Sequence, residues 1–265
     1  MRSQENENIV KYTVGSGIAF LTINRPDRMN AINDAVIQQL MNHFNKIASD
    51  EAINVIVLTG SGDQAFCSGA DLKDPNIGHT EVYAEYLEKY YQSMIKMIMG
   101  IKKPVIASIN GAVVGAGIGL ALACDYLIMA EDAYFYPAFA RIGLVPDSGV
   151  MTFLVRRMGK YRAFEAAALA RMISSDEAKQ YGMVNKVVPF GKLMKETRNT
   201  AEAFLGMPPV TVGLIKHMAN RIEDMSLSDA LEMEKDFQEI AANTKDHEEG
   251  IKAFIEKREP NFTGK

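Results

Sequence analysis

The sequence contains few of the residues that mark disulfide-linked or metal-binding proteins. Only two of its 265 residues are cysteines, Cys67 and Cys124, and two are too few for a disulfide framework. Cys124 lies in an apolar stretch, where a buried free thiol is expected. The four histidines do not have the spacing of a metal site; they are His43, His79, His217 and His247. We therefore expect neither a disulfide nor a bound metal.

The chain also lacks a strong excess of either charge. Its formal net charge is −4 at pH 7, whereas nucleic-acid binding requires clustered Lys and Arg. The first eight residues are mostly polar and do not contain the apolar stretch of a signal peptide. These features predict a cytoplasmic protein that binds neither nucleic acid nor a membrane.

One stretch, Pro104–Cys124, contains no charged residue and is long enough to cross a membrane. However, a proline, polar residues and four glycines interrupt it, and its pattern changes at Gly111. We therefore predict a buried strand over residues 104–110, a turn over 111–115 and a buried helix over 117–124.

The remaining pattern alternates apolar strands with amphipathic helices. Asn33 is an expected N-cap, because the apolar residues after it recur at helical spacing. A second helix, rich in Tyr and Met, is predicted over Thr80–Ile101. Strands are predicted at Ile18–Ile23, Val55–Thr59, Tyr126–Ala130 and Val184–Val188. This alternation indicates an α/β fold.

No strand signal is present after residue 191. Pro208–Pro209 opens one predicted helix, Ser226 caps a second, and Asp246–Lys257 forms a third. We expect residues 1–191 to form the core and residues 192–265 a helical region. This region is too short for a core of its own, so it is expected to pack on the first part or on a neighbouring subunit.

Two segments carry the strongest functional signal, Phe66–Leu72 and Asn110–Gly119. Each ends an apolar, β-branched run with small residues, so each can present bare backbone N–H groups at a strand end. Two such donors that converge on one carbonyl oxygen form an oxyanion hole. The glycines alone also fit a helix packed closely on a strand. They match neither the dinucleotide fingerprint nor a phosphate loop.

Other short segments accompany this pair in a fixed order. They are Asn24–Pro26, Asn30–Ala31, Ile173–Ala178, Gly182–Val184 and Phe254–Arg258. In this order and spacing, the chain resembles the crotonase family of enoyl-CoA hydratases and isomerases over almost its whole length. The resemblance implies a spiral of ββα turns with a helical C-terminal oligomerisation region. It also implies a homotrimer or a dimer of trimers, and an acyl-coenzyme A thioester as substrate. No cofactor would be bound permanently, because coenzyme A arrives as part of the substrate.

The resemblance also implies roles for individual residues. The oxyanion donors would be the N–H groups of Ala70 and Ala116, each typically worth about 3–4 kcal/mol to the developing anion. Phe254 and Lys257 would reach the adenine and phosphate end of coenzyme A from a neighbouring subunit, although Lys257 also fits a solvated surface charge. The other residues of the substrate and coenzyme A site would be Arg25, Arg28, Met29, Ala31, Ser68, Asp71, Leu72, Gly115 and Phe139.

The catalytic acids of the family's hydratases are missing. The hydratases that the chain resembles use two glutamates, and the matching positions here hold Gly119 and Phe139. A carboxylate follows at Asp147, where several isomerases of the family have their acidic residue, including the ring-epoxide isomerase of phenylacetate breakdown. One carboxylate can remove a proton and return it elsewhere, and apolar neighbours should raise its pKa. Asp147 also fits a helix N-cap.

These residues predict an enzyme that shifts a double bond in an enoyl-CoA or ring-type acyl-CoA, with Asp147 as the proton shuttle. The alternatives are an enoyl-CoA hydratase and an acyl-CoA-binding protein without catalysis. The Tyr and Met residues of the Thr80–Ile101 helix fit either core packing or the wall of the acyl pocket. A bulky wall of this kind favours a ring-bearing or medium-length acyl group.

Overall fold

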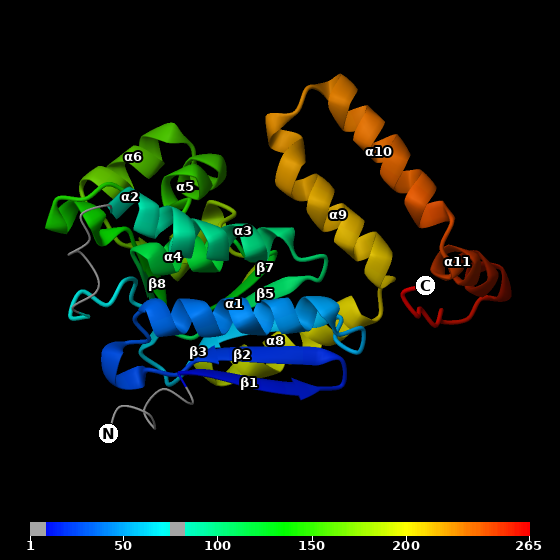
Figure 1. Cartoon of the computed structure of the whole chain (residues 1–265), viewed down its shortest axis with the longest axis horizontal. Helices are drawn as coiled ribbons and strands as arrows, with labels where there is room; N and C mark the ends of the chain where they lie inside the picture. The colour runs from blue at the N-terminus through cyan, green and yellow to red at the C-terminus, as the bar shows by residue number, and fades with distance from the viewer. Residues whose placement is uncertain (1–8, 75–82) are drawn as a thin grey trace.

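The computed structural model describes residues 9–74 and 83–265, and the chain in these ranges forms two β-sheets surrounded by helices (Figure 1). The larger sheet contains, in spatial order, β1 (Val10–Gly15), β2 (Ile18–Ile23), β3 (Val55–Gly60), β5 (Val105–Ile109), β7 (Tyr126–Ala130) and β10 (Lys186–Val188). The smaller sheet contains β4 (Ala65–Cys67), β6 (Ala112–Val114), β8 (Tyr134–Tyr136) and β9 (Ile173–Ser174).

The chain visits the two sheets alternately. It passes from β3 to β4, from β5 to β6 and from β7 to β8, and helices return it to the larger sheet after the first two of these steps. The pairs β2–β3, β3–β5, β5–β7 and β7–β10 are parallel, as are β4–β6 and β6–β8. Only β1–β2 and β8–β9 are antiparallel among the described pairs. This is the predicted spiral of ββα turns.

Several helices begin directly after a residue whose side chain caps them. Asn33 accepts a hydrogen bond from the Val36 N–H at 3.1 Å and so starts α1 (Asp34–Ser49) as predicted, and α1 packs on β1 and β2. The Ser174–Glu177 capping box starts α7 (Ser175–Gln180). The other helices of this part are η1 (Pro26–Arg28), α4 (Ala116–Leu122), η3 (Ala138–Ile142), α5 (Val150–Met158), α6 (Lys160–Ala168) and α8 (Phe190–Leu205), of which α8 packs on β3, β5 and β7.

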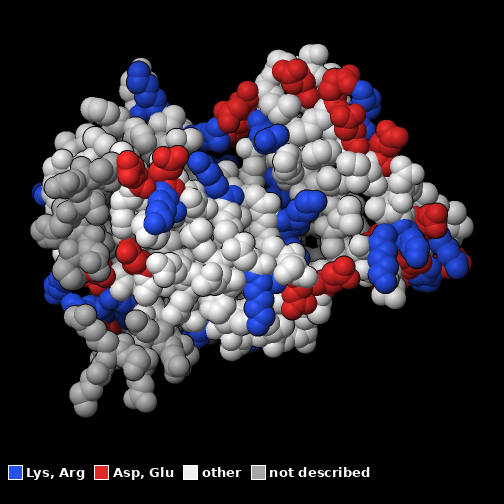
Figure 2. All heavy atoms as spheres, in the orientation of Figure 1, with Lys and Arg blue, Asp and Glu red and all other residues white. Residues whose placement is uncertain are grey.

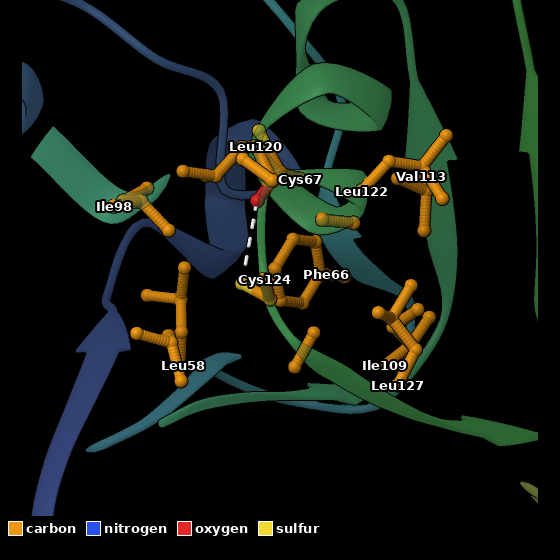
Figure 3. Close-up of a cluster of buried hydrophobic side chains, with 14 of the residues drawn as sticks. Leu58, Phe66, Cys67, Ile98, Ile109, Val113, Leu120, Leu122, Cys124 and Leu127 are labelled. Carbon is orange, nitrogen blue, oxygen red and sulfur yellow. Dashed lines mark hydrogen bonds between the residues drawn. The ribbon is translucent and has the colours of Figure 1, made fainter. Parts of the chain in front are cut away.

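Buried apolar side chains fill the space between the two sheets (Figure 3). Leu58 of β3 and Ile109 of β5 face Phe66 of β4 and the side chains of α4. Every residue of β3 and β5 is buried, as expected for parallel strands covered on both faces. Both cysteines are free and buried, and the Cys124 thiol donates to the Leu120 carbonyl at 3.4 Å. The expected buried thiol is therefore confirmed.

Two sequence expectations differ from the structure. Residues 112–114 are not a turn but the strand β6, because β4 and β8 pair with it on both sides. The helix expected over Thr80–Ile101 is described only from Tyr83, and it is not uniform. It consists of α2 (Tyr83–Tyr86), one π-helical turn η2 (Leu87–Gln92) and α3 (Ser93–Gly100).

The last three helices form an arm that extends away from the sheets (Figure 1). The arm contains α9 (Pro209–Arg221), the short η4 (Ile222–Asp224), α10 (Leu227–Ala242) and α11 (Lys245–Glu256). Pro209 opens α9 and Ser226 caps α10, as predicted. Acidic side chains follow the outer edge of this arm, and basic side chains gather near α11 (Figure 2). No helix in the described ranges is both long enough and apolar enough to cross a membrane.

A buried ion pair fastens the arm to the spiral. The Lys216 Nζ of α9 lies 2.7 Å from Asp125 Oδ2 and also donates to the backbone carbonyl of Ile98 at 2.8 Å. Asp125 Oδ2 in turn accepts from the Val105 N–H at 2.7 Å, at the start of β5. Lys216 is only 7% exposed, so it cannot exchange these partners for water.

Replacement of Lys216 by Met should therefore leave Asp125 half-buried without its cation. We expect the free energy of unfolding to fall by about 3 kcal/mol, at the low end for a broken buried pair because Asp125 retains some solvent contact. Chemical denaturation measures this change. Lys235→Met is the matched control, because its ion pair with Glu232 is exposed and should contribute less than about 1 kcal/mol. Equal losses in both variants would contradict the prediction.

Candidate active site

The described residues enclose a cavity of about 230 Å³ beside the ends of β4 and β6. Its walls come from residues 68–72, the α2–η2 helix, the β6–α4 junction, η3 and the loop before α5. Seven of the residues that the sequence assigned to the site line it, namely Ser68, Ala70, Leu72, Gly115, Ala116, Phe139 and Asp147. Segments as far apart in the chain as Ser68 and Asp147 therefore meet at one place.

The first donor segment is held by a single parallel bridge between Ile32 and Ala70. The Ile32 N–H donates to the Gly69 carbonyl at 2.7 Å, and the Asp71 N–H donates to the Ile32 carbonyl at 2.8 Å. In such a bridge the flanking residues make the hydrogen bonds, so the N–H of Ala70 itself points to the opposite side. That N–H makes no hydrogen bond to another described residue.

The second donor segment begins α4. The Gly115 N–H donates to the Tyr136 carbonyl at 3.0 Å, and Gly115 adopts a φ of 53° that favours glycine. Ala116 is the first residue of α4, where helical N–H groups lack partners in the helix. Its N–H also donates to no other described residue. Its φ is not positive, so alanine takes this place without backbone strain.

The two segments come into contact through their backbones. A Cβ added to Gly69 would lie 2.8 Å from the Val114 carbonyl oxygen and 3.4 Å from the Ala116 nitrogen. Gly69 also has a φ of 86°, so no other residue fits this place without strain. The free N–H groups of Ala70 and Ala116 thus lie on neighbouring backbones at the cavity wall, which is the arrangement that an oxyanion hole requires.

Asp147 supplies a carboxyl group to this cavity. The Ser148 hydroxyl donates to Asp147 Oδ1 at 2.9 Å. Burial raises the pKa of Asp147 above the ordinary value of an aspartate, and the hydrogen bond from Ser148 opposes this rise. The N-cap alternative is wrong, because Gly149 is the N-cap of α5 and no side chain caps that helix. Among the described residues that line the cavity, Asp147 is the only carboxylate.

The positions of the two missing glutamates are filled. A Cβ on Gly119 would lie only 2.2 Å from the backbone oxygen of Ser148, so the loop that carries Asp147 occupies the space of any side chain there. Phe139 is buried, and its ring lies 3.9 Å from the position of a Cβ on Gly115. The absence of both acids and the position of Asp147 therefore belong to one packing arrangement.

Arg25 and Asp71 contact each other outside the cavity. Their side chains form an ion pair at 2.7 Å, and Arg25 also donates to the Ala31 carbonyl at 2.6 Å. These contacts fasten the first donor segment to the loop before α1. Ser68 is fixed in the same way, because its N–H donates to the Met29 carbonyl at 3.1 Å.

The remaining predicted residues do not line the cavity in this chain. Arg28 is exposed on η1, and Ala31 is buried below the first donor segment. Phe254 and Lys257 lie on the arm, and Phe254 is 86% exposed.

The α2–η2 helix contributes three tyrosines to the wall, Tyr83, Tyr86 and Tyr91, whereas Tyr90 packs beside Tyr86. Burial raises the pKa of Tyr83, and the nearby charge of Asp147 adds to the rise. Met94 is 1% exposed, so for this residue the core-packing alternative is correct. Several wall residues in and around η3 were not predicted, and only their position at and after β8 could have indicated them; they are Tyr136, Ala138, Arg141 and Ile142.

Comparisons with known proteins identify the family of this chain. A sequence model of enoyl-CoA hydratase/isomerase matches residues 13–265. The chain belongs to this family. It is 36% identical to 1,2-epoxyphenylacetyl-CoA isomerase of Escherichia coli (strain K12), over 95% of this chain and 97% of the other. It is also 36% identical to a probable enoyl-CoA hydratase of Rhodobacter capsulatus, over 97% and 98% of the two chains.

The fold is shared with solved members of the family. An enoyl-CoA hydratase from Bacillus anthracis superposes with a TM-score of 0.92 at 33% identity, over 97% of this chain and all of the other. The family acts on coenzyme A thioesters. Nowhere in the described part of the chain do three or more His, Cys, Asp or Glu side chains gather as a metal site requires.

The contact between Gly119 and Ser148 gives a direct prediction. Gly119→Ala should lower the free energy of unfolding by roughly 1–3 kcal/mol, because the added methyl group collides with backbone rather than with a movable side chain. Thermal and urea unfolding measure the loss. Gly191→Ala is the control, because nothing lies within 4 Å of a Cβ there. If the two variants were equally stable, the close packing at Gly119 would be refuted.

Proposed function

We propose that the protein is an acyl-CoA isomerase that moves a double bond within an enoyl or ring-type acyl group, with Asp147 as its proton shuttle. The observation that carries the proposal is the single carboxylate in the described cavity wall, next to two free backbone N–H groups. The 36% identity to a 1,2-epoxyphenylacetyl-CoA isomerase supports it.

In the proposed reaction, the thioester oxygen accepts hydrogen bonds from the Ala70 and Ala116 N–H groups. Asp147 removes a proton from the acyl chain, and the electron pair moves toward the thioester carbonyl to give an enolate, which the two donors stabilise. Asp147 then returns its proton to a different carbon. One base acts twice, so the proton balance closes without a second acid.

Hydration is the competing reaction, because other relatives are named enoyl-CoA hydratases. Addition of water requires one group to activate the water and another to protonate the α-carbon. Phe139 and Gly119 provide neither. Glu81 lies outside the described residues. The statement that Asp147 is the only carboxylate therefore concerns the described residues of the wall.

The proposal also includes the coenzyme A moiety. Phe254 and Lys257 of a neighbouring subunit would contact its adenine and phosphates, which explains why an aromatic ring that is 86% exposed is present on α11. This arrangement requires a neighbouring subunit, as a homotrimer or a dimer of trimers would provide. The backbones around Arg28, Met29 and Leu72 would complete the coenzyme A site in the same subunit.

Asp147→Asn should abolish turnover, by at least about 10²-fold for loss of a general base, and leave coenzyme A thioester binding intact. The assay incubates 3-enoyl-CoA and 2-enoyl-CoA in ¹⁸O-labelled water and analyses the products by mass spectrometry. Double-bond migration without added water supports isomerisation, whereas labelled oxygen in a 3-hydroxyacyl product establishes hydration. Asp132→Asn, an exposed carboxylate after β7, is the control. Normal turnover by Asp147→Asn would sink the proposal.

The pH dependence of turnover follows from the surroundings of Asp147. Only the ionised carboxylate accepts a proton, so the rate should fall as the pH drops through its pKa. Because burial raises that pKa, the fall should begin at higher pH than for an ordinary aspartate. Ser148→Ala removes a hydrogen bond that favours the ionised form, so it should move the acid limb to still higher pH. A shift to lower pH, measured from kcat/KM profiles, would be inconsistent with this role.

A further inference from the structure

The hydroxyl of Tyr91 is a buried polar group in the cavity wall that the proposed reaction does not use. Tyr91 is 3% exposed and lines the cavity. Its oxygen is inaccessible to solvent and has no hydrogen-bond partner among the described residues. A phenylalanine would fill the same space without the cost of a buried, unpaired hydroxyl. The hydroxyl therefore requires an explanation that packing does not supply.

The π-helical turn explains how Tyr91 reaches the wall. In an ordinary helix the residue that follows Tyr86 on the same face is Tyr90, but a π-turn brings residues five apart onto one face. Tyr86 and Tyr91 both line the cavity, with ring centroids 6.0 Å apart. The Tyr86 hydroxyl is already engaged, because it donates to Asp34 Oδ1 of α1. Tyr91 is thus the member of this pair whose hydroxyl has no hydrogen-bond partner among the described residues.

Burial divides the cavity into a mouth and an inner end. Leu72 and Ile142 are more than half exposed and form the mouth. Ala116, Phe139 and Tyr91 are nearly inaccessible and form the inner end. An acyl group whose thioester oxygen lies at the Ala70 and Ala116 N–H groups would therefore extend past them toward Tyr91.

The chemistry of the Tyr91 hydroxyl indicates what it would bind. Burial raises its pKa, and the neighbouring Tyr86, Cys67 and Asp147 add to the rise, so the phenol keeps its proton. A neutral phenol donates one hydrogen bond, and its ideal partner is an oxygen acceptor. The cavity volume of about 230 Å³ exceeds the roughly 150 Å³ that holds a benzene ring in an engineered apolar cavity. A ring with one oxygen substituent fits both conditions.

We propose that Tyr91 is a specificity-determining residue whose hydroxyl donates a hydrogen bond to an oxygen atom on the acyl group of the substrate. The substrate class is then acyl-CoA thioesters whose ring or chain carries an ether, epoxide, hydroxyl or carbonyl oxygen, in preference to plain hydrocarbon enoyl chains. This inference rests on the proposed function only for the position of the acyl group in the cavity.

The test compares binding, so it does not depend on turnover. The ligands are phenylacetyl-CoA and its 2-, 3- and 4-hydroxy derivatives, and isothermal titration calorimetry of the full chain gives the dissociation constants. For at least one hydroxy isomer, wild type should bind about tenfold more tightly than it binds phenylacetyl-CoA, as expected for pairing a buried hydroxyl. Tyr91→Phe should abolish this preference and leave phenylacetyl-CoA binding unchanged. Tyr90→Phe, beside it but not in the wall, should retain the preference.

The outcomes separate this inference from the proposed function. If wild type prefers no hydroxy isomer, or if Tyr91→Phe keeps the preference, Tyr91 does not select the acyl oxygen. A marked loss of thermal stability in Tyr91→Phe would also overturn the inference, since it would reveal a structural partner for the hydroxyl. Asp147→Asn should retain the binding preference, so failure of the isomerase proposal would leave a distinct result here.

Discussion

Close packing of backbone around helix α4 is the constraint on which the site depends. A Cβ on Gly117 would lie 2.5 Å from the Cys67 carbonyl oxygen, and one on Gly119 would lie 2.2 Å from that of Ser148. The contact at Gly117 fixes the end of β4, and the chain continues from there to Ala70. The contact at Gly119 fixes the loop that carries Asp147. Side chains at these two glycines would push both segments away. The proposed oxyanion donors and the carboxylate therefore owe their positions to the same helix.

The charged residues Arg25 and Asp71 mainly hold the backbone near the site in place. Arg25 and Asp71 neutralise each other in a half-buried pair, and Arg25 also donates to the Ala31 carbonyl. The pair fixes the segment that presents the Ala70 N–H without adding a net charge to the cavity. Asp147 consequently faces mostly apolar and aromatic side chains, and burial rather than a neighbouring charge raises its pKa.

Local sequence predicted those parts of the fold that local forces determine. The apolar runs of β2 and β7 were predicted to the residue, and Asn33 and Ser226 are observed caps. The short strands of the smaller sheet, such as β6, were missed because their pairing partners define them rather than their own pattern. The π-turn has no signature of this kind, so Tyr90 and Tyr91 could not be assigned to core and cavity. The wall residues at η3, including Arg141, were also missed because their sequence has no such signature.

Phe139 connects the packing to the choice of reaction. Its ring lies against Gly115, directly beside the second donor, where an acid would otherwise contact the substrate. In the proposed reaction, an apolar ring there would help to keep water from the Ala70 and Ala116 N–H groups and would contact carbon atoms of the acyl group. An enolate formed in such a place is protected from water and can only regain a proton from the base that took it. In the proposed reaction, the same residue that replaces a hydratase acid would thus favour return of the proton by Asp147.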